Sequence, residues 1–306
     1  MRITLHIGAH HTRTPRLVGA IKSSERALSR MNIAAPPPSH YRPIISAELT
    51  RLDGLPPITD EEDAVLAQIL DGNSAAEHLI MINEDWAGDR SMMFQGGQLY
   101  TSIGESVSRV AELFSQHDVH ITMGIRNPAF LINAALSTPF IPPSLNWFLK
   151  SNDPMDLSWV APVDQLQKAI PNVPLTMWCE EDTPLIWPRI LRQVANIPED
   201  TPIRGALAAI VDALKPEGVT RFRSFLRNHT LSSPHQYERA VLAFLDKYAD
   251  ESVMTASCSV PGWTAQTVHD LSLNYEDDIA TLAARDNVTF ILPITQGDAP
   301  SDDGAA

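Results

Sequence analysis

Short apolar runs and amphipathic stretches alternate along this chain. Between the apolar runs, hydrophobic positions recur at the spacing of an α-helix, most clearly over residues 61–71, 104–117, 128–135 and 264–284. From residue 184 to about residue 250 the pattern is mainly helical. The apolar runs themselves predict short buried strands, at residues 3–7, 78–83, 119–125, 174–178 and 288–292.

This alternation predicts an α/β fold built on a central parallel sheet. Because helices must cover both faces of such a sheet, we expect three layers, with a helical C-terminal half. Proline runs at 36–38 and 56–57 predict loops. We expect one domain over residues 1–296, followed by a small, acidic tail at 297–306 whose composition predicts disorder.

The charge balance excludes several classes of partner. The 306 residues include 23 Lys and Arg against 37 Asp and Glu, which gives a net charge of −14. Such a surface disfavours nonspecific binding to nucleic acid or to an anionic membrane, so we expect neither partner. The first thirty residues are the exception, because they hold a single acid, Glu25, against six basic residues: Arg2, Arg13, Arg16, Lys22, Arg26 and Arg30.

Other features of the composition predict a cytoplasmic protein. The N-terminus lacks the apolar run of a signal peptide, and no apolar stretch is long enough to span a bilayer. The two cysteines, Cys179 and Cys258, cannot form a disulfide framework. His6, His10 and His11 lack a nearby cysteine or carboxylate that would complete a ligand set, so we expect no metal site.

The segment from Gly8 to Thr14 joins the first predicted strand to a helix. We expect Thr14 to cap this helix, with Pro15 at its first position. The unpaired N–H groups and the positive dipole end of a helix N-terminus favour a bound anion. Thr12 and Thr14 add hydroxyl groups and Arg13 adds a positive charge, so the loop is a candidate anion site. The alternative is an ordinary turn that carries surface histidines.

Other polar residues follow the carboxyl ends of the later strands, where parallel sheets bind their ligands. Glu84 follows the second predicted strand, where it is a candidate base or else a helix cap or ion-pair partner. Arg126 follows the third strand, where it binds a phosphate or pairs with an acid. The acidic run 180–182 follows the fourth strand and predicts a solvated loop or a helix start.

At these residues the sequence resembles the sulfotransferase family. Bacterial members have a loop of the form Gly-x-x-Lys-Thr-Gly-Thr-Ser/Thr, and here Gly8, Thr12 and Thr14 match it. A second match is Arg126-Asn127-Pro128, which resembles a strand-end arginine of the family that is followed by a helix. The departures from the family pattern are His11 for lysine, Arg13 for glycine, Pro15 for a hydroxyl residue and Ala134 for a serine.

The resemblance implies a P-loop NTPase-like fold and a donor, 3′-phosphoadenosine 5′-phosphosulfate (PAPS), bound as a small anionic nucleotide. It implies that Arg126 holds the 3′-phosphate and that Glu84 or His10 is the base that accepts a proton from an unknown hydroxyl or amine acceptor. The family needs no metal for this chemistry. The residues that would hold the 5′-phosphosulfate are Gly8, His11, Thr12, Arg13 and Thr14.

The four departures leave open whether the chain is an enzyme. One alternative is a protein that kept the fold, lost catalysis and binds an anion or nucleotide in a regulatory role. Another is a binder of a different nucleoside phosphate. Arg13 decides much here, because glycine tolerates a positive φ and arginine does not. If the Arg13 side chain fills the phosphate position, a donor cannot fit.

Overall fold

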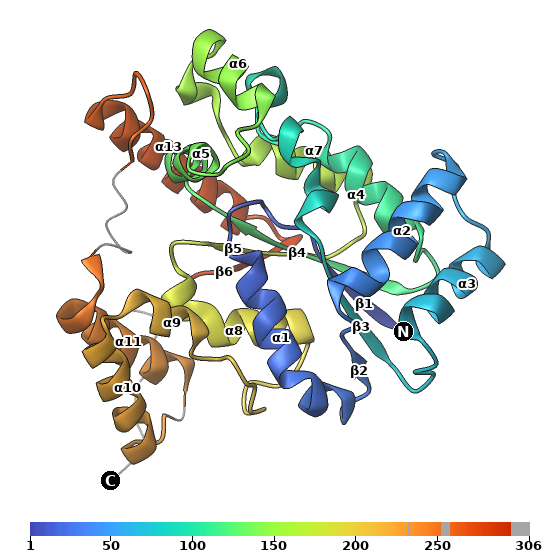
Figure 1. Ribbon diagram of the computed structural model, residues 1–306, viewed down its shortest axis with the longest axis horizontal. Helices are drawn as coiled ribbons and strands as arrows, with labels where there is room; N and C mark the ends of the chain where they lie inside the picture. The colour runs from blue at the N-terminus through green and yellow to red at the C-terminus, as the bar shows by residue number, and fades with distance from the viewer. Residues whose placement is uncertain (232, 252–257, 295–306) are drawn as a thin grey trace.

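The computed structural model of the chain describes residues 1–231, 233–251 and 258–294. Its centre is a sheet of six strands that are all parallel, in the order β2-β3-β1-β4-β5-β6. The long middle strand β4 pairs with β1 on one side and β5 on the other (Figure 1). The strands are β1 (Arg2–His6), β2 (Ile33–Ala34), β3 (His78–Ile82), β4 (Asp118–Ile125), β5 (Leu175–Cys179) and β6 (Val288–Ile291).

Helices cover both faces of the sheet. On one face, α1 (Thr14–Ser29) and α8 (Thr183–Ala195) pack together, and α9 (Ala208–Ala213), α10 (Pro216–Asn228) and α11 (Pro234–Tyr248) extend this layer outward (Figure 1). The helices of the other layer are α2 (Pro38–Leu52), α3 (Thr59–Leu70), α4 (Ile103–Glu112), α5 (Pro128–Leu136), α6 (Pro143–Ser151), α7 (Val160–Ala169) and α13 (Ala265–Ala283).

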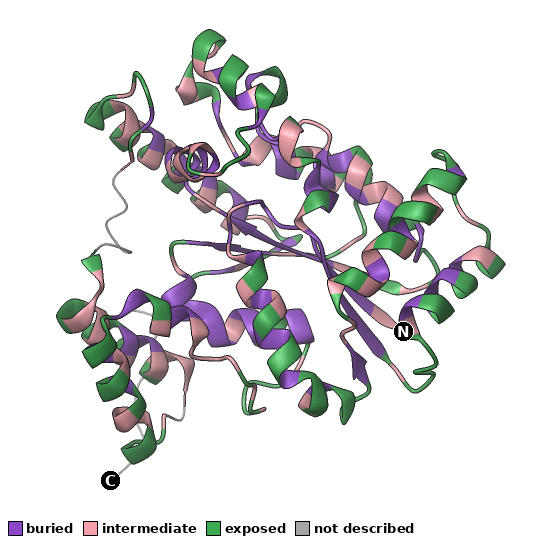
Figure 2. Ribbon diagram, in the orientation of Figure 1, coloured by how far each residue is buried: buried purple, intermediate pink, exposed green. Residues whose placement is uncertain are grey.

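The side chains of the strands alternate between these two layers. In β3, Ile80 and Ile82 join the core under α1 and α8, while Leu79 and Met81 join the core on the opposite face. All five residues of β3 are buried, and Figure 2 shows the burial of the central strands. Burial on both faces is why the predicted strands are continuous apolar runs rather than alternating ones.

The α/β prediction with a central parallel sheet is therefore confirmed, and all five predicted strands are present. The sequence missed β2, which has only two residues, and the helices α2, α6 and α7, the first of which begins within the proline run at 36–38. The predicted tail at 297–306 lies outside the described residues, and the division into one domain stays a prediction. In the described part of the chain, no helix combines the length and apolar character that crossing a membrane requires.

The topology brings four polar strand ends to one edge of the sheet. The connection that follows β1 runs on the α1 face, whereas the connections that follow its neighbours β3 and β4 run on the opposite face. Connections that diverge in this way open a crevice outside the carboxyl ends of the strands, which is where open α/β sheets bind ligands. The residues after β1, β3, β4 and β5 lie at this edge.

Candidate functional site at the carboxyl edge of the sheet

The loop after β1 is anchored to the neighbouring strands at Gly8. The N–H of Ala9 donates to the Gly124 carbonyl at 2.6 Å, and the Gly124 N–H donates to the Gly8 carbonyl at 2.7 Å. Gly8 has a φ of +105°, and a Cβ at this position would lie 3.2 Å from both Cα and Cβ of Glu84. Glycine is therefore required here by its backbone angle and by the close approach of Glu84, which brings the two predicted site residues together.

The start of α1 differs from the prediction. The helix begins at Thr14, and Arg13 occupies the N-cap position with a left-handed φ of 53°. The hydroxyl of Thr14 is buried and has no hydrogen-bond partner among the described residues, so it does not cap the helix. An arginine side chain cannot accept a hydrogen bond, and the first turn holds no acid. Pro15 has no N–H group and the Arg16 N–H donates to the Arg13 carbonyl at 2.8 Å, so the Thr14 N–H is the first-turn donor without a side-chain acceptor among the described residues.

Arg13 forms an ion pair with Glu180, the first residue after β5. Nε of Arg13 lies 2.7 Å from Oε1 of Glu180. Glu180 is only 4% exposed, so the prediction of a solvated loop is wrong at this position, whereas its alternative, a helix start, fits, because α8 begins at Thr183 with Asp182 as its N-cap. Its pKa is raised to about 7 by burial, although Arg13, Arg126 and Arg16 act in the opposite direction. Among the described residues, neither oxygen of Glu180 has a partner in hydrogen-bond geometry, so the contact with Arg13 is an ion pair only, and Nη1 of Arg13 has no hydrogen-bond partner either.

His11 and Arg126 meet on the other side of the loop. Nη1 of Arg126 donates to the His11 carbonyl at 3.1 Å, and Nε1 of the buried Trp159 donates to the Arg126 carbonyl at 2.8 Å. His11 has a positive φ of 63° and a buried Nε2 atom that finds no partner within the described ranges. Burial and the nearby Arg90, His10 and Arg126 lower the pKa of His11 to about 4, so its ring is neutral at pH 7.

His10 lies in a chain of three polar side chains. Its ring is fully buried and is stacked on Tyr100 at 5.9 Å between centroids. The Tyr100 hydroxyl accepts from the His10 backbone N–H at 2.9 Å and lies 3.0 Å from Nδ1, while Nε2 lies 3.2 Å from Oδ1 of Asp85. The arrangement is satisfied when Tyr100 donates to Nδ1 and Nε2–H donates to Asp85. Both ring nitrogens of this predicted base are therefore engaged.

Glu84 is the more available of the two predicted bases. Its side chain is 21% exposed, and its nearest described cation is Arg90, with Nη2 at 3.6 Å from Oε1. Glu84 begins the short helix η1 (Glu84–Ala87), in which Asn83 rather than Glu84 provides the cap. Thr12, by contrast, has already used its hydroxyl, because Oγ1 donates to the Ala9 carbonyl at 2.5 Å and closes the loop.

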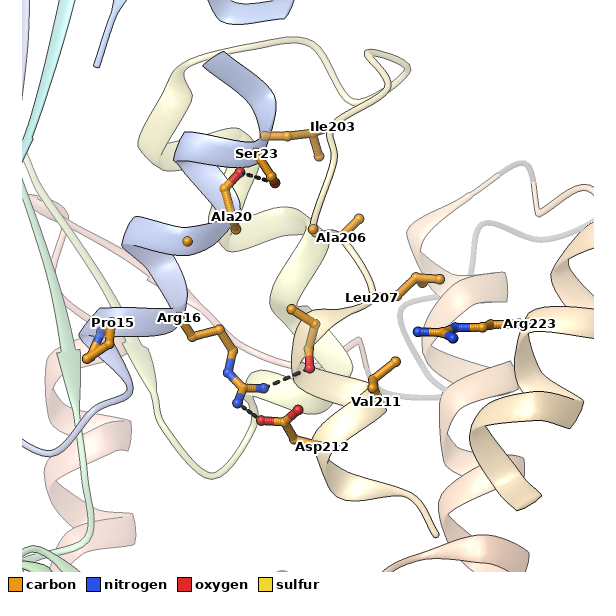
Figure 3. Close-up of a pocket in the computed structure, with 13 residues that line it drawn as sticks. Pro15, Arg16, Ala20, Ser23, Ile203, Ala206, Leu207, Val211, Asp212 and Arg223 are labelled. Atoms are coloured by element: carbon orange, nitrogen blue, oxygen red, sulfur yellow. Dashed lines mark hydrogen bonds and ion pairs between the residues drawn. The ribbon is translucent and has the colours of Figure 1, made fainter. Parts of the chain in front are cut away.

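A large cavity begins beside the loop and runs along α1. Its volume is about 830 Å³, and small or apolar residues form most of its wall, among them Ala20, Ile203 and Leu207 (Figure 3). Arg16 lies at the end nearest the loop, where Nη1 donates to the Ala208 carbonyl at 2.7 Å and Nη2 pairs with Asp212. Arg223 points toward this space from α10 (Figure 3).

Sequence reasoning found the residues of the loop and the ends of β3 and β4, but it did not assign a role to four of their partners. These are Asp85, Arg90, Tyr100 and Glu180. Asp85 and Glu180 follow strands, so position alone could have nominated them. Arg90 and Tyr100 come from the irregular segment between β3 and α4, which carries no pattern that predicts where its side chains go.

The described residues contain no group of three histidine, cysteine or carboxylate side chains placed to hold a metal ion. No family model, curated protein or solved structure matches this chain, so any account of its activity depends on the geometry of the carboxyl edge.

Proposed function

We propose that this chain is a sulfotransferase-like protein that binds a phosphorylated nucleotide of the PAPS type at the carboxyl edge of its sheet. The observation that carries the proposal is a group of buried polar atoms without protein partners on one loop and the first turn of its helix. These atoms are His11 Nε2, Arg13 Nη1 and Thr14 Oγ1. Buried polar atoms are satisfied in nearly all native structures, so three orphans on four consecutive residues indicate a bound ligand.

The charge and shape of the surroundings favour a phosphate group as that ligand. The Thr14 N–H at the start of α1 has no side-chain acceptor among the described residues, Arg13 belongs to the loop, and Arg126 contacts the loop from the end of β4. Helix N-termini and planar guanidinium groups are both suited to the oxygen atoms of phosphate. This set agrees with the expectation that Gly8, His11, Thr12, Arg13 and Thr14 hold one phosphate and that Arg126 binds a second.

The cavity beside α1 favours a nucleotide over free phosphate. It begins at Pro15 and Arg16, next to the loop, and its volume of about 830 Å³ lies within the usual range for small-molecule sites. Its largely apolar wall suits a flat base better than a second charged group. A nucleotide whose phosphate lies at the loop would place its base along α1.

Sulfuryl transfer is a second candidate function, and one observation favours it. Glu84 is a partly exposed carboxylate held against the loop by its close approach to Gly8. In that position it could take the proton from an acceptor hydroxyl as the oxygen attacks sulfur. Against transfer, Arg13 replaces the family glycine with a left-handed arginine, and Ala134 lacks the expected hydroxyl. Binding without transfer is therefore the function that the geometry supports best.

Isothermal titration calorimetry with adenosine 3′,5′-bisphosphate tests the binding proposal. We expect binding by the natural chain, at least a tenfold loss in Arg126→Ala and no change in Arg239→Ala, which removes an exposed arginine from α11. Absence of binding by the natural chain, or equal binding by both variants, would refute the site. Transfer is tested separately with radiolabelled PAPS and a panel of hydroxyl and amine acceptors, with Glu84→Gln as the inactive control.

A further inference from the structure

The carboxyl edge holds a buried acid in the place where a ligand anion is expected. Glu180 lies against Arg13, with Oε1 at 2.7 Å from Nε, and Arg126 and Arg16 are close enough to act on its charge. These three arginines come from the loop, from the end of β4 and from α1, so positive charge approaches Glu180 from three different segments. The site thus contains its own carboxylate.

Arg16 and Glu181 also act on Glu180. Arg16 is paired with Asp212 and bonded to the Ala208 carbonyl. On Glu180's own segment, Glu181 accepts hydrogen bonds from the Asn127 N–H at 3.0 Å and from the Tyr275 hydroxyl at 3.2 Å. Two arginines, Arg13 and Arg126, therefore face two carboxylates, Glu180 and Glu181.

The state of Glu180 decides how much positive charge the site offers. With Glu180 ionised, Glu180 and Glu181 balance the charges of Arg13 and Arg126, and a phosphate would face a buried carboxylate of its own sign. With Glu180 protonated, one net positive charge becomes available to a phosphate. The carboxyl group would also become a hydrogen-bond donor through Oε2, which now lacks a protein partner within the described residues.

We propose that Glu180 makes anion binding at this site dependent on proton uptake: the anion binds beside Arg13 and Arg126 only when Glu180 has taken one proton from solvent. Glu180 is then a specificity-determining residue, because it sets the pH range in which the site accepts a fully ionised phosphate. The raised pKa of this carboxyl, about 7, places that range near neutrality. The inference rests on the proposed function, since it needs the anion to bind at this loop.

Calorimetry in pairs of buffers with different ionisation enthalpies measures the proton uptake directly. With adenosine 3′,5′-bisphosphate at pH 8.5, we expect nearly one proton taken up per ligand bound by the natural chain. Its affinity should fall about tenfold for each pH unit above 7, because one proton is linked to binding. In Glu180→Gln the uptake should disappear, and the affinity at pH 8.5 should match that of the natural chain at pH 6.5.

Glu77→Gln is the matched control, because Glu77 is exposed and precedes β3 at the opposite edge of the sheet. This variant should keep the proton uptake and the pH dependence of the natural chain. Tight binding without proton uptake, or an uptake that persists in Glu180→Gln, would overturn the inference and leave the proposed function intact. If neither the natural chain nor Glu180→Gln binds at pH 6.5, the proposed function and the inference both fail.

Discussion

Arg13→Gly is the substitution that most sharply tests the energetics of the loop. Arg13 holds a left-handed conformation, with a φ of 53°, and is paired with the buried Glu180. Glycine relieves the roughly 1–2 kcal/mol cost of the left-handed conformation. It also gives the unfolded chain more freedom, which offsets roughly 0.5–1 kcal/mol of that gain. The backbone change alone should therefore stabilise the fold by about 1 kcal/mol.

The lost ion pair acts in the opposite direction, and its cost depends on pH. The folded-state pKa of Glu180 is raised from 4.5 to about 7, so the folded chain keeps a proton there that the unfolded chain releases above pH 4.5. The stability that this proton contributes is lost as the pH rises from 4.5 to about 7. Without Arg13 the folded pKa rises further, and the loss continues above pH 7 by ~1.4 kcal/mol for each unit. Arg13→Gly should thus be about 1 kcal/mol more stable at pH 6 and about 2 kcal/mol less stable at pH 9.

Urea unfolding at pH 6, 7, 8 and 9, followed by tryptophan fluorescence, measures this change of sign. Asn32→Gly is the control, because Asn32 also has a left-handed φ, 57°, and its effect should not vary with pH. In the double variant Arg13→Gly/Glu180→Gln the pH dependence introduced by the first change should vanish. A stability difference that is constant from pH 6 to 9 would refute the reasoning, as would a double variant that keeps the slope.

Three further predictions concern residues around the same loop. The pKa of His11 is lowered to about 4 by burial and nearby cations. A bound anion favours the charged ring, so NMR titration should show this pKa rising when adenosine 3′,5′-bisphosphate is added. An unchanged pKa would mean that the anion binds elsewhere. Burial lowers the pKa of His6 to about 3, so below pH 6.5 the unfolded chain binds a proton at this histidine and the native chain does not. The free energy of unfolding therefore decreases as the pH is lowered. In His6→Phe the free energy of unfolding should fall less steeply between pH 6 and pH 5, with a slope that corresponds to about one proton fewer bound on unfolding. An unchanged slope would contradict this. Gly8→Ala should lower the free energy of unfolding by about 1–3 kcal/mol in thermal unfolding, because Gly8 has a positive φ and its added Cβ would lie against Glu84. Gly54→Ala is the control and should cost less, since Gly54 also has a positive φ, +85°, but nothing lies within 4 Å of the added Cβ. Equal costs would show that the contact with Glu84 is unimportant.

The sheet was readable from the sequence because each strand is buried on both faces and so appears as an apolar run. The missed helix α2 shows the limit of this approach, since Pro36 to Pro38 indicates a loop by composition. A proline in the first turn of a helix costs no hydrogen bond, and α2 begins at Pro38. The helix is then held by packing against β3, α3 and α4, which local sequence does not reveal.

At the site, the sequence located residues better than it predicted their surroundings. Glu84 and Arg126 were identifiable because they follow strands. The ion pair of Glu180 was not, because its partner Arg13 lies far away in the chain. The role of Tyr100 was equally hidden, since its hydroxyl meets His10 only through the tertiary fold. His10 looked free in the sequence for the same reason.

The strand order also has a consequence for the synthesis of the protein. β1 is flanked by strands that are made much later, because Arg2 pairs with His78 in β3 and with Asp118 in β4. At typical rates of translation, roughly 6–24 s pass between the synthesis of β1 and the completion of β4. Throughout that time at least one edge of this apolar strand has no partner strand in the nascent chain. We therefore expect truncated products that end before β4 to aggregate, whereas chains that extend beyond it have both partners of β1 available.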